Sequence, residues 1–370
     1  MTKRLLLLGG GHAHLETMAA IGALKERGHD VTVISPSIHH YYSGMGPGML
    51  GGTYTPEEIR FDVAALVKKQ GGTFIEGKAA TVDAEAKEVV LENGDRVPYD
   101  VLSMNVGSHV PNGISVEDPA DIFTVKPIEE MLRLKERVTN ECREKNLAIA
   151  IIGGGPSSAE VAGNILQLVH NLKGKHPDIT IYCRSRFLHH FNETIKVRVK
   201  EILEEKGIHI VEKDGVASVE NGSVTLASGT VLPADIVVSA MGVKPSPVIE
   251  NSKLPMGPDN GMRVNRYLQC IDHPEIFGGG DCIYFEKRPL GKVGVFAVRE
   301  NRPLLHNLTA QLEGTPLNAF NPGGAYLLVF NLGEGIGYFQ KQGLIFDGKF
   351  AFYIKNLIDK RFMKRYQKLQ

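Results

Sequence analysis

The feature that most constrains this chain is an apolar run that leads directly into three glycines and then into a helical pattern, and it occurs twice. Residues 5–8 are four leucines followed by glycines at 9–11, and residues 147–152 are followed by glycines at 153–155. A strand, a glycine-rich turn and a helix form the first part of a βαβ unit. One such turn is a weak signal, but two in the same context are a strong one, so the sequence predicts two units.

Each unit continues into a second strand. In the first unit, residues 14–27 have a helical apolar pattern that ends at Gly28, and residues 31–34 are a β-branched run. In the second unit, residues 159–172 and 179–182 repeat this order. Strands that are apolar throughout are typical of parallel sheets covered on both faces. The sequence therefore predicts an α/β protein.

Glycines in such turns have a physical role in binding a dinucleotide. The first glycine allows the tight turn, the second lets backbone N–H groups approach a pyrophosphate, and the helix N-terminus adds partial positive charge. The third glycine, which allows close packing of helix on strand, is replaced by His14 and Ser158. We expect these side chains to push the helix outward or to point sideways. The alternative is that both are ordinary turns made of small residues.

Composition narrows the classes of function. Lys plus Arg and Asp plus Glu both total 42, so no basic excess points to a nucleic acid partner. The sequence has neither an apolar run long enough to span a membrane nor a signal-peptide pattern. The four cysteines are widely spaced and form no metal-binding pattern, which favours a reduced, cytoplasmic protein without a metal site. They are Cys142, Cys183, Cys270 and Cys282.

Three further segments lie in the order found in a known group of flavoproteins. Residues 99–108 read YDVLSMNVGS, residues 234–245 read ADIVVSAMGVKP, and residues 276–282 read IFGGGDC. Together with the two turns, they resemble the two-dinucleotide-binding-domain flavoproteins of the pyridine nucleotide–disulfide oxidoreductase superfamily. The resemblance covers about residues 4–310.

Two short segments narrow the resemblance to the type II NADH dehydrogenase-like branch. They are GGGHAH at residues 9–14 and YSGMGPG at residues 42–48. A histidine at position 14 is usual in that group, so the resemblance favours a cofactor-binding turn over an ordinary one.

The resemblance implies an α/β fold with two Rossmann-like dinucleotide-binding domains, of the three-layer ββα type that binds FAD or NAD(P). A small α+β C-terminal region completes the expected architecture. The implied domains are a discontinuous FAD-binding domain at 1–115 and 246–315, an NAD(P)H-binding domain at 116–245, and the C-terminal region at 316–370.

By resemblance, FAD binds at the first turn and NAD(P)H at the second. The second strand of the first unit ends in Ser35, where an acid usually holds the adenosine ribose, although a serine could donate a weaker hydrogen bond. Arg184 and Arg186 follow the corresponding strand of the second unit and favour NADPH, with an exposed charged loop as an equal alternative. The resemblance and these patterns assign cofactor binding to Gly9, Gly11, His12, Ala13, Ser35, Ser43, Gly44, Ala79, Asn105, Gly107, Gly280, Asp281, Lys292, Val295, Gly153, Gly155, Ser157, Ser158, Arg184, Arg186, Met241 and Gly242.

The resemblance also assigns catalytic roles to four residues. Glu160 matches a glutamate that faces the nicotinamide or the quinone passage, although the first turn of a helix also favours an acid. Lys292 resembles a lysine whose charge stabilises reduced flavin, with a solvated loop lysine as the alternative. His40 and Tyr42 lie near the expected flavin ring and could donate protons to the acceptor, or they could serve only packing and hydrogen bonding.

The cysteines and glutamines that are missing constrain the reaction. Disulfide reductases of the superfamily need a C-x4-C pair, but residues 41–50 contain no cysteine. Sulfide:quinone oxidoreductases need a cysteine shortly after the second turn, where Ser157 and Ser158 stand. The resemblance therefore implies an FAD-dependent NAD(P)H dehydrogenase that passes electrons to a quinone-type acceptor. Because Val295 and Arg299 replace two glutamines of the quinone motif, a soluble reductase with another acceptor and a low-turnover flavoprotein sensor remain alternatives.

The C-terminal region has its own pattern. Residues 326–330 and 345–350 predict paired strands, and residues 350–366 predict a helix. Basic side chains surround one apolar face of this helix, which suits an anionic membrane surface, so residues 350–370 could attach the protein to the cytoplasmic face of a membrane. The alternative is packing on its own domain or on a second subunit in a homodimer. The apolar positions are 350, 354, 357, 358, 362 and 366, and the basic residues are Lys355, Lys360, Arg361, Lys364, Arg365 and Lys368.

Overall fold

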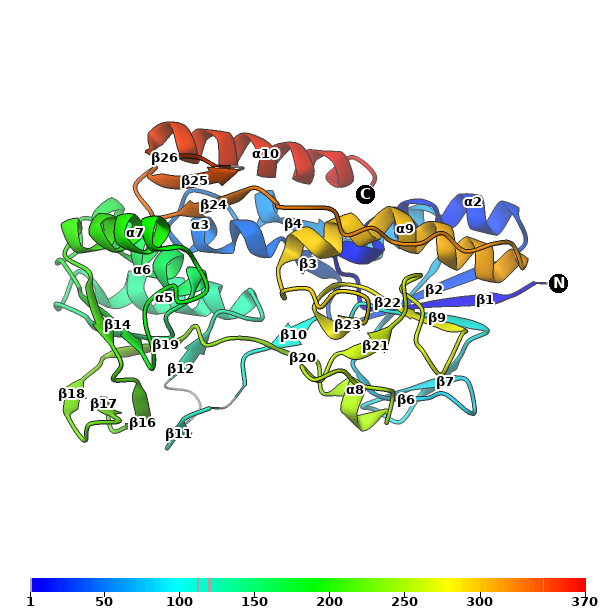
Figure 1. The fold of residues 1–370 in the computed structure, drawn as a ribbon, viewed down its shortest axis with the longest axis horizontal. Helices are drawn as coiled ribbons and strands as arrows, with labels where there is room; N and C mark the ends of the chain where they lie inside the picture. Colours follow the sequence, from blue (N-terminus) through cyan, green and yellow to red (C-terminus); the bar gives the residue numbers. More distant parts are fainter. Residues whose placement is uncertain (1, 112, 119–121, 342) are drawn as a thin grey trace.

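The computed structural model describes residues 2–111, 113–118, 122–341 and 343–370. Two parallel sheets form the centres of two lobes (Figure 1). The first sheet has the order β22-β9-β1-β2-β5, and every neighbouring pair is parallel. Its strands are β1 (Arg4–Leu8), β2 (Asp30–Ser35), β5 (Thr73–Glu76), β9 (Val101–Met104) and β22 (Ile276–Gly278).

The second sheet repeats the first in order and direction. Its order is β12-β19-β13-β14-β15, again with parallel neighbours throughout. The strand before each glycine-rich turn is central in its sheet, so the predicted α/β fold with two Rossmann-like halves is confirmed. The strands are β12 (Ile122–Thr124), β13 (Ala148–Ile152), β14 (Asp178–Cys183), β15 (His209–Glu212) and β19 (Ile236–Ser239).

Antiparallel strands complete each half. Three consecutive strands follow β5 in the first half, and three follow β15 in the second, where a short further strand pairs with them. They are β6 (Ala79–Asp83), β7 (Glu88–Leu91) and β8 (Arg96–Pro98), then β16 (Val216–Glu220), β17 (Ser223–Leu226), β18 (Val231–Pro233) and β11 (Ser115–Val116). Three two-stranded pairs are β3 (His39–Tyr41) with β4 (Arg60–Asp62), β10 (Ser108–His109) with β20 (Lys244–Pro245), and β21 (Met262–Val264) with β23 (Ile283–Phe285).

The helices after the two turns differ, and one prediction was wrong in detail. The pattern over residues 14–27 predicts one helix, but the chain forms the 3-10 turn η1 (His12–His14) and the short helices α1 (Leu15–Ala19) and α2 (Ile21–Glu26). The break comes at Ala20, whose N–H is shared between two carbonyls of the preceding turn and whose ψ of 5° leaves the helical range. After the second turn, α6 (Pro156–Asn171) is continuous.

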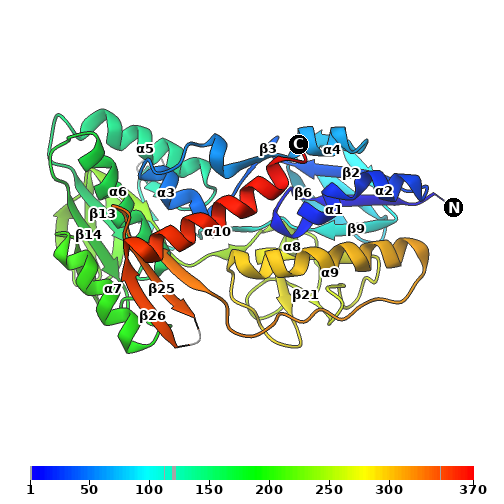
Figure 2. The same ribbon diagram turned by 90° about the horizontal axis from the view of Figure 1, so that it is seen from above.

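The remaining helices cover the sheets and join the halves. The long helix α9 lies along the first lobe beside α1, and α5 and α7 lie on the second lobe (Figures 1 and 2). These helices are η2 (Ser43–Met45), α3 (Gly46–Leu50), η3 (Glu57–Ile59), α4 (Val63–Lys69), α5 (Glu129–Glu141), α7 (Glu193–Glu205), α8 (Val248–Asn251), η5 (Gly280–Cys282) and α9 (Gly294–Glu313).

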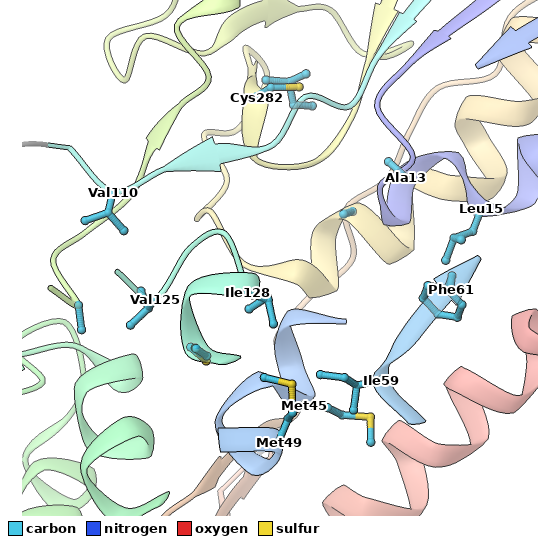
Figure 3. Packing of buried hydrophobic residues seen from close by; sticks show 14 of the residues in the cluster. Ala13, Leu15, Met45, Met49, Ile59, Phe61, Val110, Val125, Ile128 and Cys282 are labelled. Carbon is cyan, nitrogen blue, oxygen red and sulfur yellow. The ribbon is translucent and has the colours of Figure 1, made fainter. Parts of the chain in front are cut away.

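One apolar cluster runs through both halves. Met45 and Met49, at and within α3, lie beside Ile128 at the start of α5 (Figure 3). The approach is close, because a Cβ at Gly46 would lie 3.0 Å from Ile128 Cδ1. Buried residues of both sheets belong to this cluster, so one apolar core joins the two halves.

The C-terminal region forms a separate sheet and a long helix. The sheet is antiparallel, with β24 (Leu328–Asn331), β25 (Gly337–Lys341) and β26 (Leu344–Gly348). The sequence pattern missed β25. The helix α10 (Lys349–Gln367) runs from this sheet across to β3 and β4 of the first lobe (Figures 1 and 2). Its end is held there, because the Gln367 side chain donates to the carbonyl of Arg60 at 3.0 Å.

The predicted helix is present, but its apolar positions do not share one buried face. Tyr366 is buried, whereas Phe350, Leu357 and Ile358 are 65%, 58% and 45% exposed. The buried positions are instead Ala351, Lys355, Asp359, Met363 and Tyr366. The pattern was misread because an ion pair occupies the inward face, which sequence rules place outside. Within the described residues, no helix is both long and apolar enough to cross a membrane.

Candidate active site

The first glycine of each turn makes the same contact. Gly9 has a φ of +97° and Gly153 a φ of +127°, a region that side chains rarely adopt. A Cβ at Gly9 would lie 2.2 Å from the carbonyl oxygen of Asn105, and a Cβ at Gly153 would lie 2.5 Å from that of Ala240. Each turn therefore presses against the chain that leaves the neighbouring strand, and only glycine fits.

The second glycine of each turn caps the helix that follows. Gly11 precedes η1 and Gly155 precedes α6, and both have an extended backbone with ψ 178°. The first N–H groups of α6 have no partner within the helix and lie at the positive end of its dipole. The first turn is buried throughout, whereas Ser157 beside the second turn is exposed. The second turn is therefore open to an anionic ligand from solvent.

The histidine in place of the third glycine is a structural link. His14 Nδ1–H donates to the Gly9 carbonyl at 2.7 Å, so Nε2 accepts from Ser103 Oγ at 2.8 Å. Burial lowers the pKa of His14 to about 4, so the ring is neutral near neutral pH. Of the two expected outcomes, the side chain points sideways, toward β9. Ser158, at the equivalent position, is small and fully buried.

The late glycine-aspartate segment lies against the first turn. Asn105 Nδ2 donates to the carbonyl of Gly279 at 2.8 Å. The N–H of Gly280 donates to the Glu300 carboxyl at 2.5 Å. Burial raises the pKa of Glu300 to about 8, although the hydrogen bond from Gly280 opposes the shift. Helix α9 thereby ties this segment to the turn through a buried carboxyl group.

Asp281 takes part in a link between the two halves. Its carboxylate accepts from Ser108 Oγ at 2.6 Å and from Lys126 Nζ at 2.6 Å. Lys126 follows β12 of the second sheet, whereas Asp281 follows β22 of the first. An ion pair with side chains 27% and 13% exposed thus lies at the junction of the lobes.

Two buried polar atoms in the turns have no hydrogen-bond partner within the described part of the chain. They are His12 Nε2 and Ser158 Oγ. Burying a polar atom without a partner is unfavourable, so each atom is a candidate contact for a bound group. These atoms, the extended glycines and the open second turn fit FAD at the first turn and NAD(P)H at the second.

The other predicted cofactor residues lie at the ends of elements, and their roles stay predictions. Ser35 ends β2 and Ala79 begins β6, and both are buried. Arg184 and Arg186 are exposed just after β14. Short 3-10 helices or the first turn of α9 contain Ala13, Ser43, Gly44 and Val295, and irregular segments after strands contain Gly107, Met241 and Gly242.

Helix α10 places an ion pair against residues 42–44 of the first half. Lys355 Nζ donates to the Asp359 carboxylate at 2.6 Å and to the carbonyl of Gly44 at 2.6 Å. Tyr42 OH donates to the other oxygen of Asp359 at 3.2 Å. Burial, followed by the charge of Asp359, raises the pKa of Tyr42 well above its usual value, so the phenol keeps its proton.

The charges of Lys355 and Asp359 also act on the carboxyl group of Glu160. Its carboxyl group accepts from the N–H of Asn331 at 2.8 Å. Burial raises the pKa of Glu160 to about 7, and the positive charge of Lys355 opposes the shift. The structure thus brings Glu160 and Tyr42, both predicted catalytic residues, into the field of Lys355 and Asp359. We refer to Tyr42, Glu160, Lys355 and Asp359 as the α10 cluster.

The other two predicted catalytic residues lie elsewhere. His40 Nε2 is 3.0 Å from His12 Nδ1, and the two rings meet at 74°. Lys292 donates to the carbonyl of Ile283 at 2.5 Å and pairs with Asp259 at 2.7 Å. Its ammonium group is therefore already held by this chain, and a role at the flavin stays a prediction.

A comparison with protein families assigns the chain. The protein-family model described as pyridine nucleotide-disulphide oxidoreductase matches residues 3–307. The chain belongs to this family. It is an oxidoreductase, and membership of the family implies binding of a flavin and of a pyridine nucleotide.

Relatives within this oxidoreductase family match nearly the whole chain. The type II NADH:quinone oxidoreductase of Staphylococcus saprophyticus is 26% identical over 97% of this chain and 94% of that protein. The structure of the sulfide:quinone oxidoreductase from Aquifex aeolicus has a TM-score of 0.81 at 20% identity, covering 100% of this chain and 92% of that one. NDH2 from Plasmodium falciparum in complex with NADH has a TM-score of 0.80 at 16% identity, covering 98% and 96%. These two structures share the fold.

The cysteines of this pyridine nucleotide-disulphide oxidoreductase are not arranged for disulfide chemistry. All four are free and buried. Burial raises the pKa of Cys282 to about 12 and that of Cys183 to about 12, which keeps both thiols protonated.

Sequence reasoning missed four charged residues of the site. Lys355 was named only as one of several basic residues of its helix, and Asp359, Lys126 and Glu300 were given no role. A signal existed for the first pair, because opposite charges four residues apart lie on one face of a helix. No local pattern marks Lys126 or Glu300, since their partners Asp281 and Gly280 are 155 and 20 residues away.

Proposed function

We propose that the protein is an FAD-dependent NAD(P)H dehydrogenase that passes electrons to a quinone-type acceptor. The observation that carries the proposal is the α10 cluster, in which the buried Lys355 and Asp359 lie with the half-buried Tyr42 and Glu160 between the two halves. The curated relative named as a type II NADH:quinone oxidoreductase supports this class of acceptor. The glycine-rich turns of the two halves, which fit two dinucleotides, support the donor and the flavin.

The residues that would hold FAD belong to the first half. Gly9, Gly11 and His12 would face the pyrophosphate from the first turn, and Asp281 would face the ribityl chain. Bound FAD would supply the carrier that accepts a hydride from the nucleotide and returns electrons to the acceptor. The second turn would hold NAD(P)H through the N-terminus of α6 and the exposed Ser157.

The α10 cluster would manage charge and protons near the acceptor. With a pKa of about 7, Glu160 exists in both protonation states near neutral pH and can hold or release a proton at its carboxyl oxygen. Lys355 forms an ion pair with Asp359, and its positive charge would favour a developing negative charge on a bound acceptor. Tyr42 keeps Asp359 oriented by its hydrogen bond.

Two other functions predict different behaviour. Val295 and Arg299 lie on α9 where quinone-reducing relatives are expected to carry glutamines, and Arg299 instead donates to the carbonyls of Pro322 and Gly324 at 2.5 and 3.0 Å. This departure is the observation that favours a reductase with another acceptor or a low-turnover flavoprotein. The four cysteines are all free and buried, which argues against sulfide oxidation.

The test uses the purified full chain. We expect a yellow protein whose flavin absorbance bleaches on anaerobic addition of NADPH or NADH and recovers when a short-chain quinone is added. Steady-state oxidation of both nucleotides should accelerate with the quinone. A bleached flavin that ferricyanide but not quinone reoxidises would support a different acceptor. A flavin that neither nucleotide reduces would support the sensor.

We further propose that the outer face of α10 contacts an anionic membrane. Phe350, Tyr353, Leu357 and Ile358 are 65%, 60%, 58% and 45% exposed, and Leu344 of β26 beside them is 60% exposed. Exposed basic residues on the same helix add electrostatic attraction of about 1 kcal/mol each at such a surface. They are Arg361, Lys364, Arg365 and Lys368.

Vesicle flotation tests the membrane proposal. We expect the protein to float with vesicles that contain anionic lipid, and the double variant Leu357→Ser and Ile358→Ser to lose most of this binding. Val231→Ser removes a 62% exposed apolar residue from the distant β18 and should bind as the original chain does. Equal binding by all three proteins would refute the proposal and leave packing on a second copy as the role of this face.

A further inference from the structure

Three polar residues meet where the two halves join, and each comes after a strand of one of the two parallel sheets. Ser108 comes after β9, Asp281 after β22 and Lys126 after β12. Lys126 Nζ donates to Asp281 Oδ2 at 2.6 Å and to Ser108 Oγ at 3.0 Å, and Ser108 Oγ donates to the same carboxylate oxygen at 2.6 Å. Ligands of α/β proteins bind outside the carboxyl ends of such strands. The three side chains therefore lie where a cofactor is expected.

These hydrogen bonds leave part of the Asp281 carboxylate for a bound group. Both reach Oδ2, and Oδ1 accepts no hydrogen bond within the described residues. The side chains of Lys126 and Asp281 are 27% and 13% exposed. Because water and salt screen a partly buried pair less than a surface pair, the charge of Lys126 acts strongly on its surroundings. Lys126 thus orients the carboxylate and offsets its negative charge.

The positive charge of Lys126 also reaches the first turn. Burial lowers the pKa of His40 to about 4, and the charge of Lys126 acts in the same direction. Burial, then His40, then Lys126 lower the pKa of His12 well below its usual value. His12 begins η1 in the first turn, where FAD is proposed to bind. The ammonium group therefore lies close enough to act on both Asp281 and this turn.

Lys292, the lysine that the resemblance places beside the flavin, has different surroundings. It donates to the carbonyl of Ile283 at 2.5 Å and pairs with Asp259 at 2.7 Å. Ile283 belongs to β23, which pairs with β21 outside the two five-stranded sheets. The partners of Lys292 are therefore not residues proposed to hold the cofactor, whereas one partner of Lys126 is Asp281.

The reduction of FAD makes a nearby charge important. Hydride transfer from NAD(P)H gives NAD(P)⁺ and leaves the reduced cofactor with one more negative charge than the oxidised cofactor. A positive charge close to the cofactor stabilises the reduced form, and an unpaired carboxylate destabilises it. Removal of Lys126 would leave Asp281 as such a carboxylate, because the pair is partly buried.

We propose that Lys126, which the second half supplies, is the lysine whose charge stabilises reduced flavin in the first half, and that it positions Asp281 for the ribityl chain. Lys126 takes the role that the resemblance gives to Lys292. It is a positioning residue, since it acts on the cofactor through Asp281 and through its charge. The proposal rests on the proposed function only for the binding of FAD at the first turn, and not for the nucleotide or the acceptor.

The midpoint potential of the bound flavin tests the proposal in the purified full chain. Reduction by dithionite beside a reference dye needs neither NAD(P)H nor a quinone. We expect Lys126→Met to weaken binding of reduced FAD relative to oxidised FAD at least about tenfold, which is a shift of about 30 mV to a more negative potential for a two-electron couple. Asp281→Asn should shift the potential in the opposite direction, and the double variant should lie between the two.

Three further variants are controls. Lys126→Arg keeps the positive charge and should keep the potential of the original chain. Lys135→Met removes another half-buried lysine that links the halves, since Lys135 Nζ on α5 donates to the carbonyl of Met49 at 3.0 Å. This variant should also keep the original potential. Lys292→Met should keep it as well, which directly compares the two lysines.

Other outcomes overturn the proposal. A potential that falls in Lys292→Met but not in Lys126→Met would return the role to Lys292. Shifts of Lys126→Met and Asp281→Asn in the same direction would mean that both substitutions only disturb the structure of the pocket. If Lys126→Met does not fold with flavin, Asp281→Asn decides, because the absence of a rise in its potential refutes the electrostatic role.

Failure of the proposed function gives a different result. A flavin that NAD(P)H reduces but no quinone reoxidises would refute the proposed acceptor, and the dithionite titration would still decide the role of Lys126. An original chain that binds no FAD would refute both proposals.

Discussion

The two glycine-rich turns have the same backbone but different surroundings. Gly9 and Gly153 share a positive φ and a close contact with the neighbouring return segment, and Gly11 and Gly155 share an extended cap. The first turn, however, is buried and leads into a broken helix, whereas the second is open and leads into the continuous helix α6. The difference suits a resident cofactor in the first half and an exchanging substrate in the second.

The largest expected effect tests what the turns have in common. Gly9→Ala and Gly153→Ala each force a side chain into a positive φ and place a Cβ 2.2 or 2.5 Å from a backbone carbonyl. Neither carbonyl can move without disturbing its sheet, so we expect each variant to lose about 4 kcal/mol or more of stability. Urea unfolding of each purified variant, or its absence from the soluble fraction, measures this. A Tm close to that of the original chain for either variant would show that the turns are not equivalent.

The second expected effect concerns the position of the third glycine of each turn, where the first half has His14 and the second half has Ser158. His14 has a pKa of about 4 in the folded protein, against about 6.5 in an unfolded chain. Between these values the unfolded chain takes up a proton that the folded protein excludes, so stability falls as the pH falls from about 6.5 toward 4. This single group contributes at most about 3 kcal/mol to that loss.

The matched variant is His14→Ser, which copies the residue at Ser158. It should be less stable than the original chain at pH 7.5, because two hydrogen bonds are lost, yet its stability should depend less on pH. His12 and His40 also have lowered pKa values but are present in both proteins, so the difference isolates His14. Urea midpoints at pH 7.5 and 5 give the comparison, and parallel pH dependences would contradict it.

The third expected effect separates stability from binding. A Cβ at Gly11 would lie 1.7 Å from Asn105 Oδ1, whereas a Cβ at Gly155 would meet no atom within 4 Å. Gly11→Ala must displace the Asn105 amide from Gly279 and should cost about 2 kcal/mol. Gly155→Ala should change stability by less than about 0.5 kcal/mol. Its methyl group would nevertheless lie where a pyrophosphate approaches, so we expect the Kd for NADPH to rise at least about tenfold.

Thermal unfolding and a nucleotide titration of both variants give these quantities. Flavin content is the control, because Gly155→Ala should keep it. An unchanged nucleotide Kd for Gly155→Ala would remove the second turn from the substrate site, although the fold assignment would stand.

The sequence predicted the parts of the fold that local patterns determine. Both parallel sheets follow from apolar runs next to glycines, and the strand bounds agree to within about one residue for residues 5–8 and 147–152. The break at Ala20 has no counterpart in the apolar pattern of residues 14–27, because that pattern continues across it. The strand β25 was missed, although a turn with positive φ at Gly333, Glu334 and Gly335 comes shortly before it.

The site was less predictable, because tertiary contacts create it. His12 and His40 are 28 residues apart, and Tyr42 and Asp359 are 317 apart. Pattern rules place the charged residues of an amphipathic helix on its solvent-exposed face. The Lys355–Asp359 pair instead lies on the face of α10 that packs against the protein, because each charge has a partner there. The glycine positions were predictable, since backbone geometry alone demands them.

The smallest expected effect concerns the residues expected to bind the adenosine end of the nucleotide in each half. In the first half β2 ends in Ser35, whereas Arg184 and Arg186 follow β14 and are exposed. Glu212, the acid that ends β15, accepts from the N–H of Phe187 at 2.7 Å and pairs with Lys200 at 3.3 Å, so its carboxylate already has partners. Arginine binds a 2′-phosphate by charge-assisted hydrogen bonds.

We therefore expect Arg184→Ala and Arg186→Ala each to lower kcat/KM for NADPH by up to about tenfold, a change of about 1.4 kcal/mol, and to leave kcat/KM for NADH nearly unchanged. Arg137→Ala, on the 49% exposed arginine of α5 in the same half, controls for a general loss of positive charge. Equal losses with the two nucleotides would mean that these arginines act on the pyrophosphate or on folding. In that case the two halves would differ in how open their turns are, but not in how they select the adenosine end of a nucleotide.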